Sequence, residues 1–131
     1  MRRETNPETV NALIGRDFPG VDYSEVLSEP LHVCLVDDDS GAIFAWRGPG
    51  TYEVHVFFAV RGRDAINLGH AMLDYMREHH AARKFWALVP IGSEHVKVFT
   101  RLMGWASQGV LKTRHGDNEL FTSEIDPCPQ S

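Results

Sequence analysis

The segment Tyr52–Leu73 constrains the fold of this chain more than any other. Its first part, residues 51–60, is apolar on both faces of a strand, which is typical of a central strand covered from both sides. A charged turn, Arg61-Gly62-Arg63-Asp64, follows, and an amphipathic helix capped by Asp64 is expected over about residues 65–81. The unpaired N–H groups at a helix start carry positive partial charge, and two arginines stand beside them. The junction is therefore predicted to bind a phosphate.

The apolar pattern on either side of this junction predicts one α+β domain over residues 1–131, with flexible ends at 1–5 and 126–131. A strand, a helix and a strand in succession require a parallel crossover, whereas the other neighbouring strands form hairpins. We therefore expect a mixed, mostly antiparallel sheet flanked by helices. The predicted helices are 7–17, 22–28, 65–81 and 94–103, and the predicted strands are 31–36, 42–46, 51–60, 84–89, 105–112 and 118–125.

Local signals place several of these boundaries. Asn6 before Pro7 is typical of a helix start, and Phe18-Pro19-Gly20 ends that helix. Ser93 is predicted to cap the helix 94–103, and Gly104 to end it in the left-handed conformation.

Composition narrows the classes of partner. With 43% hydrophobic residues the chain can bury a core, and its formal net charge of −5 argues against non-specific nucleic-acid binding. No apolar run approaches the about 20 residues of a membrane-spanning helix, and the basic start Met1–Arg3 is not followed by the apolar core expected of a signal peptide. The two cysteines, Cys34 and Cys128, do not indicate a disulfide framework. We expect a cytoplasmic protein whose partners include neither nucleic acid nor membrane.

No metal site is predicted. The run Asp37-Asp38-Asp39-Ser40-Gly41 lacks the alternating ligands and distal glutamate of a calcium loop and is typical of a solvated turn. His79-His80 complements a helix dipole, and the other histidines show no metal spacing.

The order of elements resembles the GNAT superfamily of acyl-CoA-dependent N-acyltransferases over roughly residues 7–125. Three places carry the resemblance: the strand-turn-helix Tyr52–Leu73, the segment Pro90-Ile91-Gly92-Ser93 before a helix, and that helix's ending Leu102-Met103-Gly104-Trp105, similar to the family's "x-x-Gly-Phe". The segments 50–55 and 115–121 are also similar to small GNAT-like proteins encoded in phages and prophages.

The resemblance implies transfer of an acetyl or other acyl group from CoA to an amine on a small molecule or a protein. Backbone N–H groups and the two arginines of the turn would hold the pyrophosphate, and a backbone N–H near Phe58–Val60 would stabilise the oxyanion. Glu53 and His55 share a face of the central strand near the family's base, where His55 can act directly or through water. The cofactor-binding residues implied are Phe58, Val60, Arg61, Gly62, Arg63, Ala65, Ile66, Asn67, Leu68, Gly69 and Ser93.

The sequence departs from the family's pattern in four ways. The loop pattern Gln/Arg-x-x-Gly-x-Gly/Ala has no clean register here: starting from Arg61 the glycines are missing, and starting from Asp64 one is recovered at Gly69. Ser93 stands where an asparagine is often found, and Thr100 stands where a tyrosine often acts as general acid. The family's first strand is absent or very short. Since a thiolate leaves readily, loss of the tyrosine need not abolish catalysis.

Other interpretations stay open. Arg61 and Arg63 can form a solvated turn with Asp64, His55 can be a core histidine, and Glu53 can pair with an arginine on a neighbouring strand. The three tryptophans suit a core better than a stacking platform.

At the level of function, the alternatives are a GNAT-fold CoA-binding or interaction module without catalysis, possibly phage-related, and a ligand-binding domain of another α+β fold. Absence of a splayed pair of parallel strands at 56–60 and 85–89 would favour the latter. A homodimer is left open by the sequence.

Overall fold

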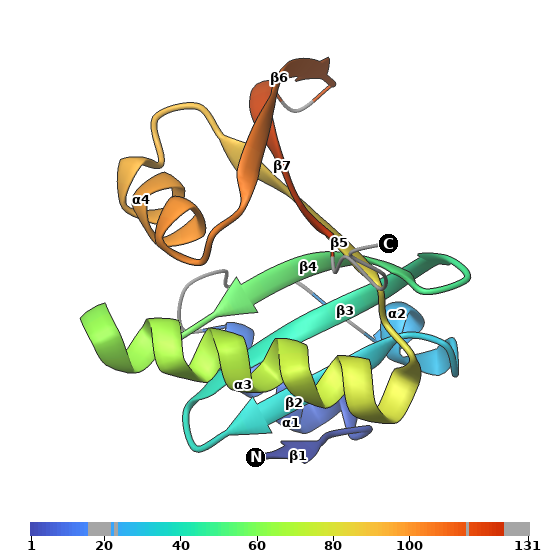
Figure 1. Ribbon diagram of the computed structural model, residues 1–131. Coiled ribbons are helices and arrows are strands. Elements are labelled where there is room, and N and C mark those ends of the chain that lie inside the picture. Colours follow the sequence, from blue (N-terminus) through green and yellow to red (C-terminus); the bar gives the residue numbers. More distant parts are fainter. Residues whose placement is uncertain (16–21, 23, 115, 125–131) are drawn as a thin grey trace.

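The computed structural model describes residues 1–15, 22, 24–114 and 116–124 (Figure 1). The helices are α1 (Pro7–Ile14), α2 (Ser24–Ser28), α3 (Gly62–His80) and α4 (Glu94–Leu102), and the strands are β1 (Arg2–Arg3), β2 (Val33–Asp37), β3 (Ser40–Gly48), β4 (Thr51–Phe57), β5 (Lys84–Pro90), β6 (Ala106–Thr113) and β7 (Gly116–Glu124). The predicted breaker Phe18-Pro19-Gly20, the hairpin turn at His115 and the tail 126–131 lie outside the described residues. Within the described part, no helix is both long and apolar enough to cross a membrane.

All strands belong to one mixed sheet with the order β1-β2-β3-β4-β5-β7-β6, in which β4 and β5 are parallel and the other neighbours antiparallel. This confirms the predicted α+β class and mostly antiparallel sheet. Helix α3 lies across one face of β2–β4, while α1 and α2 lie on the other (Figure 1).

Two apolar clusters match these two faces. Met72, Leu73 and Met76 of α3 pack with alternate residues of β2 and β3, such as Leu35 and Phe44. The second cluster joins Val10 and Ile14 of α1 to the other faces of the same strands and to Phe57 of β4. The apolar stripe predicted for α3 is therefore its buried face.

The N-terminus differs from the flexible end that the sequence predicts. Arg2 and Arg3 form strand β1 opposite Val36 and Leu35 of β2. The Arg3 guanidinium also donates to the backbone carbonyls of Pro30 and His32, both at 3.1 Å. These bonds fix a segment whose composition alone contains no strand signal.

Asp64 does not cap α3, contrary to the prediction. The helix begins at Gly62 with Arg61 in the N-cap position, and Asp64 lies in the first turn. Gly62 has a φ of 60°, a left-handed conformation that glycine adopts at little cost, so the chain turns into the helix sooner than expected.

Two other boundary predictions are confirmed. Asn6 is the N-cap of α1, where its Oδ1 accepts from the Glu8 N–H at 2.9 Å and Pro7 is the first helical residue. Gly104 follows α4 with a φ of 90°, as predicted for a residue that ends a helix in the left-handed conformation.

Candidate functional site: a cleft between two diverging strands

The site is created by the divergence of β4 and β5. The two strands pair in parallel through only three positions: Thr51 with Lys84, Tyr52 with Phe85 and Glu53 with Trp86. Beyond them, β4 stays bonded to β3 and β5 stays bonded to β7. The sheet therefore opens at its middle, and the splayed pair of parallel strands that distinguishes the GNAT interpretation from other α+β folds is present.

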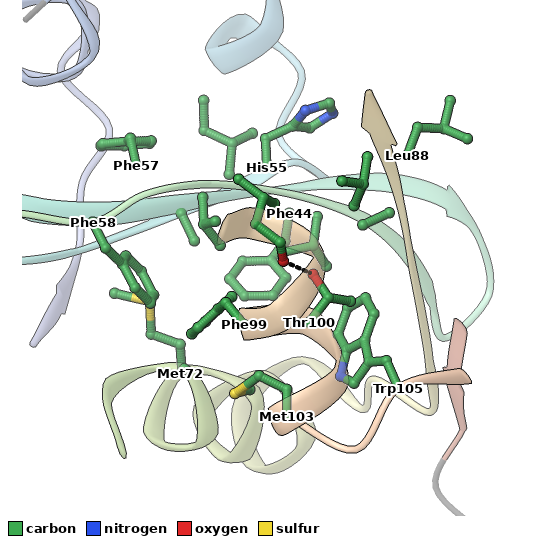
Figure 2. A pocket seen from close by; sticks show the side chains of 18 of the residues that line it. Phe44, His55, Phe57, Phe58, Met72, Leu88, Phe99, Thr100, Met103 and Trp105 are labelled. Carbon is green, nitrogen blue, oxygen red and sulfur yellow. Dashed lines mark hydrogen bonds between the residues drawn. The ribbon is translucent and has the colours of Figure 1, made fainter. Parts of the chain in front are cut away.

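A cavity of about 430 Å³ occupies the opening. Its walls come from β3, β4, β5, α3 and α4, and most of the side chains are apolar or aromatic. Figure 2 shows His55 and Leu88 on one side of it and Phe99, Met103 and Trp105 on the other. Of the predicted site residues, the cavity brings together His55, Phe58, Gly69 and Ser93.

Glu53 pairs on one side with His55 of the same strand and on the other with Arg47 of β3. The Glu53 Oε2 lies 2.9 Å from His55 Nε2, and its Oε1 lies 2.8 Å from an Arg47 guanidinium nitrogen. The His55 hydrogen bond, with Arg47 beside it, lowers the pKa of the Glu53 carboxyl from its ordinary 4.5, and burial opposes this shift. Glu53 therefore has the arginine partner on a neighbouring strand that the second interpretation predicts. Because it is ionised and doubly bonded, it is better suited to orient His55 than to take a proton itself.

His55 is the more accessible member of this pair. Its side chain is 51% exposed, compared with 12% for Glu53, and it lines the cavity. It is not a buried core histidine, which removes one of the alternatives left open by the sequence. While His55 Nε2 stays bonded to Glu53, Nδ1 is the ring nitrogen that can face a ligand.

The turn after β4 is held by its own side chains. Arg61 donates to the carbonyls of Phe58 at 2.8 Å and Val60 at 3.2 Å, and the Ala59 N–H donates to the buried Ser40 hydroxyl at 2.8 Å. The sequence predicts a strand that continues to residue 60. These bonds end β4 earlier, at Phe57. Arg61 thus fixes the turn, whereas the exposed Arg63 lies on the first turn of α3, beside N–H groups that have no partner inside the helix.

The predicted cofactor residues of α3 separate into two groups. Asn67 is exposed and Ile66 and Leu68 are half-buried, while Ala65 and Gly69 are buried against the core. A Cβ at Gly69 would lie 2.8 Å from the Met103 side chain and 3.4 Å from the Phe99 ring. The glycine that the sequence suggests for phosphate binding therefore serves the close approach of α3 to α4.

Helix α4 supplies polar groups that the sequence analysis only partly identified. Ser93 is its N-cap residue, but its hydroxyl makes no capping bond, so it can reach a ligand in the cavity. The buried Thr100 donates from its hydroxyl to the Val96 carbonyl at 2.7 Å (Figure 2). Thr100 therefore lies in the cavity wall at the position where the resemblance implies a general acid. Its hydroxyl proton is already donated to the Val96 carbonyl.

Sequence reasoning missed Ser40 and the lining role of Phe99, Met103 and Trp105. Ser40 was assigned to a solvated turn because its neighbours are aspartates, and only the packing of β3 against the turn after β4 makes it internal. The apolar spacing of Phe99 and Met103 on α4 was visible, but it indicates a buried face and cannot distinguish core from cavity wall.

Comparison with known proteins gives the fold a name. No protein-family model and no curated protein matches the sequence. Among solved structures, an acetyltransferase of the GNAT family from Bacillus anthracis superposes with a TM-score of 0.57 at 17% identity, covering 71% of this chain and 64% of that one. The chain has the GNAT fold.

Two other acetyltransferases match over nearly the full length of the GNAT-fold chain. A mutant of spermidine N-acetyltransferase SpeG from Vibrio cholerae has a TM-score of 0.72 at 13% identity, covering 94% of this chain and 93% of that one. An aminoglycoside acetyltransferase in complex with coenzyme A and kanamycin has a TM-score of 0.71 at 12% identity, covering 94% and 92%. At such identities the likeness establishes the fold, while activity has to be argued from the site.

Proposed function

We propose that the protein is an acyl-CoA-dependent N-acyltransferase. The observation that carries the proposal is the cleft between β4 and β5, placed beside the N-terminus of α3 in a fold shared with an acetyltransferase that holds coenzyme A. Acetyl-CoA or another acyl-CoA would supply an activated thioester, and an amine on a small molecule or a protein would receive the acyl group.

The residues present fit such a ligand in part. The first-turn N–H groups of α3 and the exposed Arg63 suit a phosphate, and the apolar cleft suits an uncharged chain. Asp64 on the same turn opposes a phosphate by repulsion, and Arg61 is engaged by the Phe58 and Val60 carbonyls. Backbone N–H groups of the turn would therefore contribute more to phosphate binding than the Arg61 and Asp64 side chains do.

His55 is the candidate base. Held by Glu53, it would accept the proton that an attacking amine loses as the C–N bond forms and the C–S bond breaks, and the thiolate would leave with the negative charge. Thr100 offers no proton, because its hydroxyl donates to Val96.

Calorimetric titration with CoA tests the proposal. The wild-type chain is expected to bind CoA, and Arg63→Ala to weaken binding by about 1 to 3 kcal/mol if that arginine forms a charge-assisted bond to phosphate. Arg114→Ala, an exposed arginine beyond β6, is the matched control and should leave affinity unchanged. Absence of any CoA binding at millimolar concentration would refute the proposal.

The acceptor is proposed to carry its amine on an uncharged group. The described lining of the cleft contains no Asp, Glu, Lys or Arg, so it has no carboxylate to bind a second ammonium group. Spermidine and kanamycin, named for two of the similar structures, are polycations. An amine panel that measures release of the CoA thiol should favour monoamines on apolar groups over both compounds.

A CoA-binding module without catalysis is the second candidate. Asp64 beside the phosphate position and the occupied Thr100 hydroxyl favour it. CoA binding with no thiol release across the whole amine panel would support this candidate against the enzyme.

Narrower predictions accompany the proposed enzyme. A cytoplasmic location agrees with the buried free thiol of Cys34, and independence from nucleic acid agrees with the net charge of −5. The relation to phage-encoded proteins rests on the segments 50–55 and 115–121 alone. A homodimer would use the exposed edge strand β6, where Val110 is 56% exposed, and light scattering would detect it.

A further inference from the structure

His32 accepts a backbone hydrogen bond just beyond the end of strand β2. Strands β2 and β3 pair as far as Val33 with Phe44. Two residues further along β3, the Trp46 N–H donates to the Nδ1 atom of the His32 imidazole at 2.9 Å. Because only an unprotonated ring nitrogen can accept a bond, this contact requires a neutral imidazole with its proton on Nε2. The His32 side chain therefore continues the edge of the sheet only in its neutral form.

The backbone of His32 is fixed on both sides. Its N–H donates to the Glu29 carbonyl at 3.1 Å, and its carbonyl accepts from the Arg3 guanidinium at 3.1 Å. Two charged groups act on the ring itself, Arg47 of β3 and Glu29 just after α2. Partial burial, and then Arg47, lower the pKa of the His32 imidazole from its ordinary 6.5, and Glu29 opposes them. The neutral form therefore predominates at pH 7.

The bond to Trp46 stands next to a bulge in β3. Trp46 pairs with Tyr52 and Gly48 pairs with Thr51, so Arg47 is an extra residue between two pairs. A bulge changes the direction of the side chain that it carries. Since Arg47 has no residue directly opposite it on β4, its position depends on the residues on either side of it in β3.

The Arg47 guanidinium connects Trp46 to the proposed base. Its Nη1 donates to the Trp46 carbonyl at 3.3 Å, while its Nε and Nη2 lie 3.0 and 2.8 Å from Glu53 Oε1. The other carboxylate oxygen of Glu53 lies 2.9 Å from His55 Nε2. A series of hydrogen bonds thus runs from His32, through residue Trp46, to His55 in the cleft.

We infer that neutral His32 is a positioning residue, which acts through Trp46 and Arg47 to fix the carboxylate that orients the proposed base. This inference rests on the proposed function, since the orientation of His55 affects a rate only if His55 takes the proton of the amine. Protonation of His32 removes the acceptor of the Trp46 N–H and loosens the bulge. The effect is exerted from outside the cleft, because His32 is not among the described residues that line it.

Two substitutions separate the acceptor from the ring. His32→Asn places an amide oxygen the same number of bonds from Cα as Nδ1, so it can accept from Trp46 but cannot titrate. His32→Leu keeps a side chain and removes the acceptor. His70→Leu, which replaces an exposed histidine of α3 outside the cleft lining, is the matched control.

At pH 7, His32→Leu is expected to lower kcat for acyl transfer by about tenfold and to leave KM for the acyl-CoA unchanged, because a misoriented base slows the chemical step. His32→Asn and His70→Leu should keep the wild-type kcat. A wild-type kcat in His32→Leu, or equal losses in His32→Leu and His32→Asn, would overturn the inference.

Acid should reproduce the effect of His32→Leu in the wild type. As the pH falls below about 6.5, wild-type His32 takes up a proton, whereas Asn does not. The ratio of wild-type kcat to that of His32→Asn should therefore fall from about one towards the ratio of His32→Leu to His32→Asn. Titration of His55 cancels in this ratio, because both proteins contain it. A ratio that is constant with pH would contradict the inference, and this comparison does not depend on the folding of His32→Leu.

A further readout needs no activity. Hydrogen exchange at the Trp46 amide should be about tenfold faster or more in His32→Leu and unchanged in His32→Asn. The Arg47 Nε–H resonance, which reports the bond to Glu53, should move in His32→Leu alone. An unaltered exchange rate and an unmoved resonance would overturn the inference. If the wild type released no CoA thiol with any amine, the proposed function would fail, and these two measurements would still decide whether His32 positions Arg47.

Discussion

At the scale of single residues, strand β4 carries both the proposed base, His55, and the carboxylate that holds it, Glu53. The two side chains point to the same face of β4 because they are two positions apart. Arg47 from β3 reaches the same carboxylate, which fixes its charge. The base candidate is therefore oriented by a charged neighbour that is largely shielded from water, while its own ring stays accessible.

We expect His55→Gln to lower kcat for acyl transfer by about 100-fold or more, because Gln can keep a bond to Glu53 but cannot accept the amine proton. The affinity for CoA should change little. His95→Gln, an exposed histidine of α4, provides the comparison and should retain the wild-type rate. The rate is measured as thiol release and the affinity by calorimetry; equal rates for the two variants would exclude His55 as the base.

The charge of Glu53 should also appear in the pH dependence of stability. Its folded-state pKa is lowered below the ordinary 4.5, so the folded protein binds the proton less tightly than the unfolded chain does. The stabilisation is thus complete above about pH 4.5 and is lost as the pH falls through the lowered folded pKa. Glu53→Gln should cost about 1 kcal/mol at pH 7.

Urea unfolding at pH 7 and at pH 3 checks this expectation. The gap in unfolding free energy between wild type and Glu53→Gln should narrow at the lower pH. Glu78→Gln, which removes a carboxylate of α3 away from the cleft, is the control. A gap that is constant over the range would mean that the Glu53 carboxylate contributes nothing through its charge.

At the scale of elements, the end of β4 decides where the cleft opens. Strand β4 stops at Phe57 because the Ala59 N–H is bonded to the Ser40 side chain and no longer follows the strand ladder. Arg61 closes the same turn over the carbonyls of Phe58 and Val60. Together these bonds set the direction in which α3 leaves the sheet.

Ser40→Ala should therefore loosen the turn. The Ala59 N–H would lose its acceptor, and the free energy of unfolding should fall by about 1 to 3 kcal/mol. Hydrogen exchange at the Ala59 amide should become faster, and CoA affinity should fall because the start of α3 is less fixed. Ser28→Ala, which removes an exposed hydroxyl on α2, should show neither change. Unaltered exchange at Ala59 would contradict the role given to Ser40.

At the scale of the whole molecule, the sheet consists of two halves that are joined by the short parallel pairing of β4 with β5. One half contains β1–β4 with α1–α3, and the other contains β5–β7 with α4, which Lys97 ties to Glu119 of β7 at 3.1 Å. The halves are joined by three strand positions, by the core around Phe85 and by the contact of Gly69 with Met103 and Phe99. A ligand in the cleft would contact both halves.

Thermal unfolding should report this bridging. At a CoA concentration about 100 times Kd, binding adds about 2.7 kcal/mol to stability, which corresponds to a rise in Tm of about 5 to 10 °C. If Arg63→Ala weakens binding as expected, its Tm should rise less at the same concentration. A wild-type Tm that is independent of CoA concentration would argue against binding to the folded state.

Much of this architecture was predictable from local patterns. Asn6 before Pro7, the hairpin of β2 with β3, the stripe of α3 and the glycine after α4 each depend on neighbouring residues, so their sequence signals were sufficient. The errors lie where a distant residue intervenes. β1 needs the edge of β2, and the early end of β4 needs the bond between the Ala59 N–H and Ser40. The described chain also gives Gly69 a packing role that no loop pattern reveals.

By itself, the sequence determined the class of fold, the order of its elements and the strand-turn-helix at Tyr52–Leu73, because periodicity and turn chemistry are local. Only the tertiary structure decided that β4 and β5 separate after three pairs, that Glu53 is held by Arg47, and that Trp105 borders a cavity. Each of these depends on residues far apart in the chain. Whether an apolar side chain fills a core or lines a cleft is settled by what lies opposite it, which no local pattern records.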